Sequence, residues 1–255
     1  VVFQWERELK QGVQLRNRAY YTQLDWDSRG TIYAGFVLAG LGLEPLPMTL
    51  SRYRPVLVDD QQIFGNEIEL RLSGDVGDIQ HQALLGAEVQ QFRDLFILAI
   101  PTALDINVGT GEQTPGILVP LPTNAGDATT DILSLYALDQ VELTPTCSVL
   151  AGGRVDRLDF EDDAQGTDRS DNVFSPFVGV VVELAESLSA YGNVGRGFNP
   201  PSTQIVGSRG EPEVSEQIEG GVRWSIPESG WASLFSVYSL DRENIAIPNS
   251  TGLTR

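Results

Sequence analysis

Polar and apolar residues alternate along most of this chain with the two-residue period of β-strands. In one segment Ile68, Leu70 and Leu72 alternate with charged residues, and the pattern recurs before and after it. One face of each segment is therefore apolar and the other polar. The alternation predicts an all-β chain of about ten strands, at residues 1–8, 13–38, 63–73, 79–96, 129–142, 147–160, 173–183, 188–194, 213–226 and 231–243.

Short and long connections take turns between these segments. Glycine and proline predict short turns at residues 9–12, 74–78, 143–146, 184–187 and 227–230. Long polar stretches lie between them, at residues 39–62, 97–128, 158–172, 195–212 and after 244. An outer-membrane barrel has short periplasmic turns and long extracellular loops. The sequence therefore predicts antiparallel up-and-down strands of a transmembrane outer-membrane β-barrel.

A soluble antiparallel sheet with one face on a core would show the same alternation. Two observations favour the membrane. The strand at 149–155 keeps Ala151, Gly152 and Gly153 where a soluble core would hold bulky side chains. Aromatic residues also cluster near segment ends, as in the interfacial girdles of barrels; they are Trp5, Tyr20, Tyr21, Trp26, Phe92, Phe96, Phe174, Phe177, Trp224 and Trp231.

Composition argues against several functions. The net charge of -18 disfavours nucleic acid as a partner. One histidine, His81, and one cysteine, Cys147, cannot form a zinc site, and we assign Cys147 no role. The acidic stretch 159–171 lacks EF-hand spacing and is interpreted as a solvated face, and 109–116 lacks the end of a phosphate loop. We expect no catalytic site, no metal site and no cofactor.

Five sequence blocks carry a family resemblance. SLYALDQVELTPTCSVLAGGRVDRLDF at 134–160 is similar to a strand, turn and strand of TonB-dependent siderophore receptors of the ferrichrome type. SPFVGVVVELAESLSAYGNVGRGFNPP at 175–201 resembles the next hairpin, and the blocks at 81–94, 213–224 and 234–245 follow the family order. Phe177 stands where the family commonly has arginine, and Gly192 and Gly195 stand in place of serines.

The resemblance implies an outer-membrane receptor that takes up ferric siderophores with energy supplied through TonB. It covers residues 1–255 as part of one β-barrel domain, and we expect the plug domain, the TonB-binding segment and the remaining strands to lie outside this sequence. The expected partners are a ferric siderophore, the TonB complex and outer-membrane lipid. Two alternatives stay open: a porin-like channel or structural barrel without specific uptake, and a ten-stranded barrel that closes on itself.

Candidate ligand-binding residues follow from the predicted long-connection end of the strand at 188–194. Arg196, Phe198 and Asn199 leave this strand toward the external mouth. A guanidinium can pair with anionic oxygens of a ferric chelate, and an aromatic ring can cover its apolar body. The competing interpretation is that Arg196 pairs with a carboxylate of the barrel wall and Phe198 belongs to the upper aromatic girdle.

Overall fold

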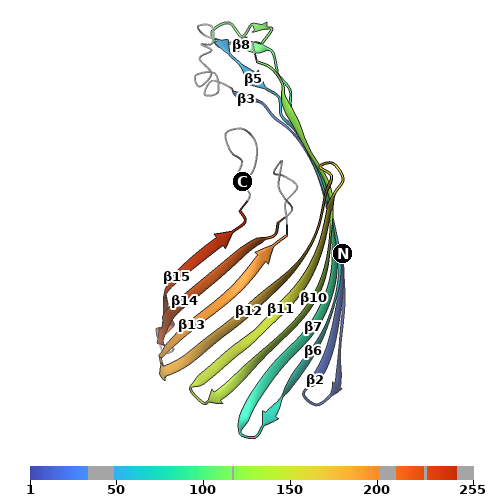
Figure 1. The fold of residues 1–255 in the computed structure, drawn as a ribbon. Coiled ribbons are helices and arrows are strands. Elements are labelled where there is room, and N and C mark those ends of the chain that lie inside the picture. Colours follow the sequence, from blue (N-terminus) through green and yellow to red (C-terminus); the bar gives the residue numbers. More distant parts are fainter. Residues whose placement is uncertain (34–48, 117, 201–210, 227–228, 246–255) are drawn as a thin grey trace.

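The computed structural model describes residues 1–33, 49–116, 118–200, 211–226 and 229–245. Ten strands form one antiparallel sheet in which every neighbour is the next long strand of the chain (Figure 1). This confirms the predicted up-and-down topology. In these residues no helix is long and apolar enough to cross a membrane.

Each of the ten predicted segments overlaps one long strand of this sheet, but some bounds differ: the strand predicted at 13–38 ends at Arg29, and the strand predicted at 63–73 spans Val56–Val76. The strands are β1 (Val2–Lys10), β2 (Val13–Arg29), β6 (Val56–Val76), β7 (Ile79–Ile100), β10 (Leu121–Thr144), β11 (Cys147–Asp162), β12 (Thr167–Ala185), β13 (Leu188–Asn199), β14 (Glu213–Ile226) and β15 (Trp231–Glu243).

The predicted short turns connect the hairpins at one rim of the sheet. Gly12, Gly77 and Gly230 have φ angles of 74°, 67° and 68°, which L-residues with side chains rarely adopt. Gly12 is also crowded, because a β-carbon there would lie 2.2 Å from the carbonyl oxygen of Ser73. Residues 227–228 of the last turn lie outside the described part of the chain.

The two longest connections contain small strands of their own. Between β2 and β6 lie β3 (Ile32–Tyr33), β4 (Thr49–Leu50) and β5 (Arg52–Tyr53), and between β7 and β10 lie β8 (Asp105–Asn107) and β9 (Gln113–Thr114). The predicted loops at 39–62, 195–212 and after 244 fall partly outside the described residues.

The prediction of a long loop at 158–172 is wrong. β11 and β12 continue through this stretch in antiparallel register, and only Asp163–Gly166 form the turn between them. The side chain of Asp162 closes this turn by accepting hydrogen bonds from the backbone amides of Ala164 and Gln165, at 3.0 and 3.2 Å. Polar residues occur here because both faces of the hairpin extend beyond the apolar band, so the acidic character does not mark a loop.

The two faces of the curved sheet have opposite character. Leu135 and Val155 point to the convex face and are 61% and 51% exposed, whereas Ser134 and Asp156 on the other face are completely buried. Polar side chains of the buried face meet across an intervening strand: a hydroxyl on β10 reaches a carboxylate on β6 beyond β7. Side chains of strands that are not neighbours can meet only where they point toward one another, so this face is the concave one. Lipid outside and a polar lumen inside explain the arrangement.

The sheet is open in the described residues. β1 and β15 are its two edges and do not pair with each other. A ten-stranded barrel that closes on itself is therefore not the arrangement that this structure adopts. Every residue of both edge strands is exposed.

Candidate functional site

Charged side chains on the concave wall form one continuous cluster, which we call the ionic belt. Arg16 Nε lies 2.7 Å from Glu69 Oε2, and Arg18 Nε lies 3.3 Å from Glu67 Oε2. The Tyr136 hydroxyl donates to Glu67 Oε1 at 2.7 Å and also lies 3.1 Å from Glu69 Oε1. The complete belt contains Glu6, Arg16, Arg18, Tyr20, Glu67, Glu69, Arg71, Glu88, Ser134, Tyr136, Arg154 and Asp156.

Arg154 on β11 holds the most buried part of the ionic belt together. Its Nη2 lies 2.8 Å from Glu88 Oε2, and its Nε lies 2.7 Å from Asp156 Oδ1. The Ser134 hydroxyl also donates to Asp156, at 2.5 Å. The Arg154 guanidinium lies over the ring of Tyr136, 5.6 Å from its centroid. A fully buried carboxylate needs such partners, because desolvation without them is costly.

Three tyrosines of the concave wall each lie across a glycine of the neighbouring strand. A β-carbon on the glycine would come within 2.1–2.7 Å of a ring atom, so only glycine fits there. The hydroxyls of Tyr20, Tyr136 and Tyr191 donate to carboxylates of glutamates, and the distances are 2.8 Å to Glu88, 2.7 Å to Glu67 and 2.6 Å to Glu219. The girdle interpretation is therefore wrong for Tyr20. The three pairs are Tyr20–Gly65, Tyr136–Gly86 and Tyr191–Gly221.

The two longest connections join to form one structure, which we call the loop cap and define as residues 49–55 and 101–116. β4 pairs with β8, and β8 pairs with β9. The Arg54 amide donates to the Pro101 carbonyl at 2.9 Å, and the Ala103 amide donates to the Arg52 carbonyl at 3.0 Å. The Arg52 guanidinium adds hydrogen bonds of 3.0 and 2.6 Å to the Leu104 carbonyl. Figure 1 shows β3, β5 and β8 together beyond the ends of the long strands.

The loop cap has a buried centre. The Ser51 hydroxyl donates to Asp105 Oδ2 at 3.0 Å, and these residues are only 2% and 3% exposed. Tyr53 is also buried, at 6% exposure. The cap is therefore packed and is held by side chains from both connections.

The predicted ligand-binding residues lie at the long-connection end of β13 but have separate surroundings. Arg196 Nε is 3.7 Å from Glu216 Oε1, an exposed pair on the sheet itself. Asn199 is the exposed last residue of β13. Their role in ligand binding stays a prediction. Phe198 packs against the apolar cluster of Ile132, Leu158 and Val173.

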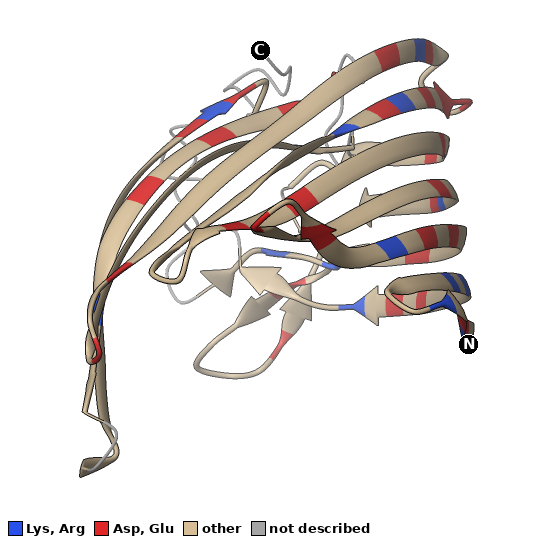
Figure 2. Cartoon of the chain, turned by 90° about the horizontal axis from the view of Figure 1, so that it is seen from below, with Lys and Arg blue, Asp and Glu red and all other residues tan. Residues whose placement is uncertain are grey.

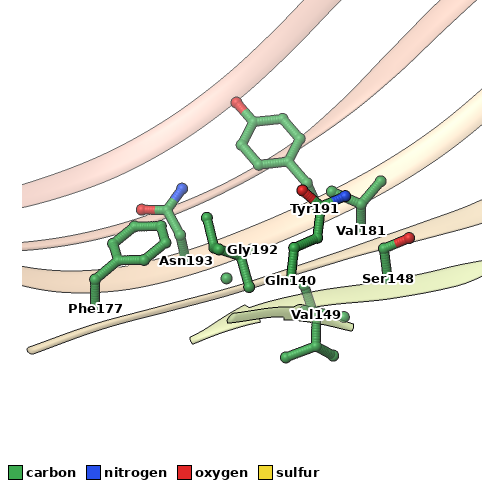
Figure 3. Close-up of a pocket in the computed structure, with 11 residues that line it drawn as sticks. Gln140, Ser148, Val149, Phe177, Val181, Tyr191, Gly192 and Asn193 are labelled. Carbon is green, nitrogen blue, oxygen red and sulfur yellow. The ribbon is translucent and has the colours of Figure 1, made fainter. Parts of the chain in front are cut away.

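A hollow of about 270 Å³ lies on the concave wall between the ionic belt and the short-turn rim. Figure 3 shows Phe177, Tyr191 and Asn193 on the same side of the sheet, whereas Val149 points the opposite way. No carboxylate, amine or guanidinium occurs among the described residues that line it. We call it the lumen hollow, lined on the concave side by Gln140, Ser148, Leu150, Phe177, Gly179, Val181, Tyr191 and Asn193.

The convex face becomes polar toward the long-connection end. The Gln91 amide donates to Asp131 at 2.8 Å, and Arg157 Nε lies 3.1 Å from Asp159 Oδ2. The Arg157 guanidinium and then the Ser170 hydroxyl hydrogen-bond the Asp159 carboxylate and hold its pKa below the usual range. These polar residues lie beyond the apolar band of the convex face, toward the long-connection end. Figure 2 shows acidic and basic bands mixed along the strands, with long uncharged stretches between them.

His81 and Cys147 both lie near the short-turn rim of the sheet. His81 stands near the start of β7 beside a short turn, with Nδ1 at 2.8 Å from Asp139 Oδ2. Cys147 is the first residue of β11 and carries a free thiol. In the described part of the chain, no group of three or more metal-ligating side chains is close enough to hold an ion.

The sequence analysis did not identify the ionic belt or the lumen hollow. The charges of the belt are visible as polar positions in the alternating segments, but partners such as Glu88 and Arg154 are 66 residues apart. The register between strands is needed to bring them together. The run Ala151-Gly152-Gly153 could have indicated a hollow in the wall, because Gly152, the partner of Phe177, leaves space on the concave face.

An antiparallel meander with a lipid-compatible convex face and a polar concave face defines the wall of a transmembrane outer-membrane barrel. Residues 1–255 match the family described as TonB dependent receptor-like, beta-barrel, so the chain belongs to the TonB-dependent receptor family. It is accordingly an outer-membrane protein of the Gram-negative type. This confirms the predicted family and fold, whereas the ferrichrome type stays a prediction.

Relatives agree with this assignment. The Bordetella pertussis protein named Probable TonB-dependent receptor BfrD is 25% identical over 290 residues, which cover 98% of this chain and 38% of that protein. The ferric-catecholate import receptor Fiu of Escherichia coli has a TM-score of 0.77 at 18% identity, covering 99% of this chain and 42% of Fiu. The siderophore receptor PiuA of Acinetobacter baumannii has a TM-score of 0.74 at 16% identity, covering 93% and 39%. The chain thus spans less than half the length of these proteins.

Proposed function

We propose that this chain is the wall section of an outer-membrane receptor that takes up ferric siderophores with energy supplied through TonB. The observation that carries the proposal is the family match over residues 1–255. The siderophore receptors among its structural neighbours share its fold. Uptake through a membrane wall, rather than catalysis, is the activity that this family membership favours.

The geometry fits a receptor better than an open channel. The loop cap joins both long connections through backbone and side-chain hydrogen bonds, so a structured surface lies at the end where a ligand would first arrive. A porin-like channel depends on an open, water-filled lumen. We therefore rank specific uptake above passive diffusion.

The ligand site remains part of the proposal. We propose that Arg196, Phe198 and Asn199 contribute to the external mouth together with the loop cap and with parts of the full receptor beyond this chain. The remaining strands, the plug and the TonB-binding segment are proposed to complete the receptor. The transported ligand is proposed to be a ferric siderophore, with no resident cofactor.

Iron uptake by the complete receptor tests the proposal. The full-length gene would be deleted and restored in its host, and ⁵⁵Fe uptake would be measured with ferric tris-catecholate and ferric tris-hydroxamate complexes. We expect uptake of at least one complex to require both the receptor and TonB. Diffusion of small uncharged sugars would also be measured into liposomes that contain the purified receptor and, separately, into liposomes that contain a porin. Equal diffusion rates in the two preparations, together with no receptor-dependent iron uptake, would favour the channel instead.

A further inference from the structure

We propose that a second hollow of the wall, on its convex face, binds a membrane lipid whose head group is an uncharged sugar. This hollow lies between the apolar band and the polar residues of the long-connection end. It opens to the membrane and not to the lumen, so neither the cargo nor the plug domain competes for it. The inference goes beyond the proposed uptake function and holds whatever the receptor transports.

The hollow has a volume of about 500 Å³ and is lined by the inner strands β6, β7, β10 and β11. Further strands of a barrel would pair with the edges β1 and β15, so they leave this surface uncovered. Phe64, Val89 and Leu133 point to the convex face and are 55%, 49% and 51% exposed. We call this site the outer hollow, and its convex-facing lining consists of Phe64, Val89, Gln91, Asp131, Leu133 and Asp159.

The end of the outer hollow nearer the short turns is apolar. Val89 and Leu133 are direct cross-strand partners, and the next row of the same face pairs Ala87 with Leu135. Leu135 is 61% exposed and belongs to the apolar band. The outer hollow is therefore continuous with the surface that contacts acyl chains, and one such chain can lie along Val89 and Leu133.

The other end of the outer hollow is a row formed by an aromatic ring, an amide and two carboxylates. Phe64 is the direct partner of Gln91, which is also the partner of Asp131. Asp159 follows on β11. Neighbouring strands lie about 4.8 Å apart, so this row has the dimensions of one or two sugar rings. The C–H face of a sugar can pack on Phe64, while its hydroxyls hydrogen-bond the Gln91 amide and the Asp131 carboxylate.

The charges of this row favour an uncharged head group. Asp159 is held by Arg157 at 3.1 Å and by the Ser170 hydroxyl, whereas Asp131 accepts from the neutral Gln91 amide at 2.8 Å. A phosphate beside Asp131 would meet a like charge, but a sugar hydroxyl can donate to this carboxylate in a charge-assisted hydrogen bond. An ammonium group could pair with Asp131 but would leave the Phe64 end of the row unfilled.

The order of the two rows matches the order of the parts in a glycolipid. Asp131 precedes Leu133 by two residues on β10, which is a rise of about 7 Å. The long connections of outer-membrane barrels are extracellular, so the polar row lies at the outer border of the membrane and the apolar row lies deeper. A sugar on the polar row therefore places its acyl chains on the apolar row.

Lipid binding to the purified full-length receptor tests the inference. The receptor would be freed of copurified lipid in a nonionic detergent and titrated with glucosyl diacylglycerol, phosphatidylglycerol or phosphatidylethanolamine of identical acyl chains. Native mass spectrometry would measure the bound lipid, and melting temperatures would confirm that each variant is folded. The variants of the outer hollow are Phe64→Ala and Asp131→Ala. The matched controls on the same face are Phe174→Ala, whose side chain is 54% exposed, and Asp168→Ala.

We expect the unmodified receptor to bind the glucosyl lipid about fivefold more tightly than either phospholipid. Phe64→Ala removes the stacking surface and Asp131→Ala removes the hydroxyl acceptor, so each should abolish most of this preference. Both controls should keep it. Asp131→Asn retains an oxygen that accepts hydrogen bonds, so the affinity for the glucosyl lipid should stay within about twofold.

Equal binding of the three lipids by the unmodified receptor would overturn the inference, as would a preference that survives in both variants of the outer hollow. A preference for phosphatidylethanolamine that Asp131→Asn abolishes would assign the site to an ammonium head group instead. A preference for phosphatidylglycerol that requires Mg²⁺ would assign it to a phosphate bridged by the metal ion. The ⁵⁵Fe measurement tests siderophore uptake separately, so failure of either proposal is distinguishable from failure of the other.

Discussion

Strands β1, β2, β6, β7, β10 and β11 differ in chemistry from strands β12 and β13 on the same concave wall. The first group carries the ionic belt, in which buried carboxylates and arginines neutralise one another across several strands. On β12 and β13 the corresponding concave-face positions carry small, apolar, amide or hydroxyl side chains, at 173, 175, 177, 179 and 181 and at 189, 191, 193 and 195. The difference indicates that one part of the wall is held by its own ion pairs, whereas strands β12 and β13 form their part of the wall at these positions without charged side chains on this face.

The largest effect is expected where the belt loses its central cation. Arg154→Met retains the unbranched aliphatic part of the side chain but leaves buried Asp156 and Glu88 without their cation. Removing one partner of a buried pair costs about 3–5 kcal/mol, and the value here should lie near the lower limit because Arg154 is 33% exposed. Urea unfolding of the full receptor in lipid vesicles would measure this loss.

The matched control for Arg154 is Arg157→Met, two residues along β11. Arg157 pairs with Asp159 on the convex face, where its side chain is 60% exposed. An exposed pair contributes about 0–1 kcal/mol. Equal destabilisation by both substitutions would contradict the structural role of the belt.

The tyrosine–glycine crossings should give the next largest effect. A β-carbon in Gly86→Ala would lie 2.1 Å from the ring of Tyr136 and would move this ring away from Glu67. Overpacking of this kind costs about 1–3 kcal/mol. The same unfolding measurement on Gly74→Ala is the control, since no heavy atom lies within 4 Å of a β-carbon there. A shift of the same size in both variants would mean that the crossings do not constrain the wall.

The loop cap should respond locally. Arg52→Ala removes the guanidinium that holds the Leu104 carbonyl, and a hydrogen bond to a charged group contributes about 1.5–3 kcal/mol. We expect faster hydrogen exchange at the amides of Arg54 and Ala103, with no change in the global unfolding midpoint. Arg54→Ala is the control, because within the described part of the two connections Arg54 joins them through its backbone amide, which the substitution keeps. Unchanged exchange in Arg52→Ala would show that the cap does not depend on this contact.

The smallest expected effect on stability is at the exposed ion pair of the predicted external site. Arg196→Ala with Phe198→Ala in the full-length receptor should weaken siderophore binding several-fold while the amount of barrel in the outer membrane stays the same. The Arg196–Glu216 pair is exposed and contributes about 0–1 kcal/mol, so loss of this pair does not explain lost binding. Because Phe198 packs against Ile132, Leu158 and Val173, binding is expressed per folded barrel. Glu216→Gln is the control, since it removes the ion pair and keeps the guanidinium. Equal affinity in the double variant would remove both residues from the site.

The sequence predicted the strands and short turns because each depends on local information. Alternation at Ile68, Leu70 and Leu72 marks one face, and glycine at position 12 or 77 marks a turn. The hairpin at 158–172 was missed because Leu158 and Phe160 alternate with charges beyond the membrane band, where polarity no longer distinguishes a loop from a strand.

The chemistry of the wall could not be predicted in the same way. Tyr20 and Gly65 become partners only in the observed register, 45 residues apart in sequence, and the aromatic pattern alone suggested a girdle. Arg196, Phe198 and Asn199 were correctly placed at the long-connection end of β13, but the partners of Arg196 and Phe198 depend on how neighbouring strands curve. Side-chain roles on this wall thus require the pairing of distant strands.

One paired measurement tests the division of the concave wall most directly. Unfolding free energy would be determined for Arg154→Met on β11 and for Asn193→Ala on β13 in the full-length receptor. We expect Arg154→Met to lower this free energy by about 3 kcal/mol and Asn193→Ala to lower it by about 1 kcal/mol or less. An equal loss of unfolding free energy in both variants would contradict the structural role of the ionic belt.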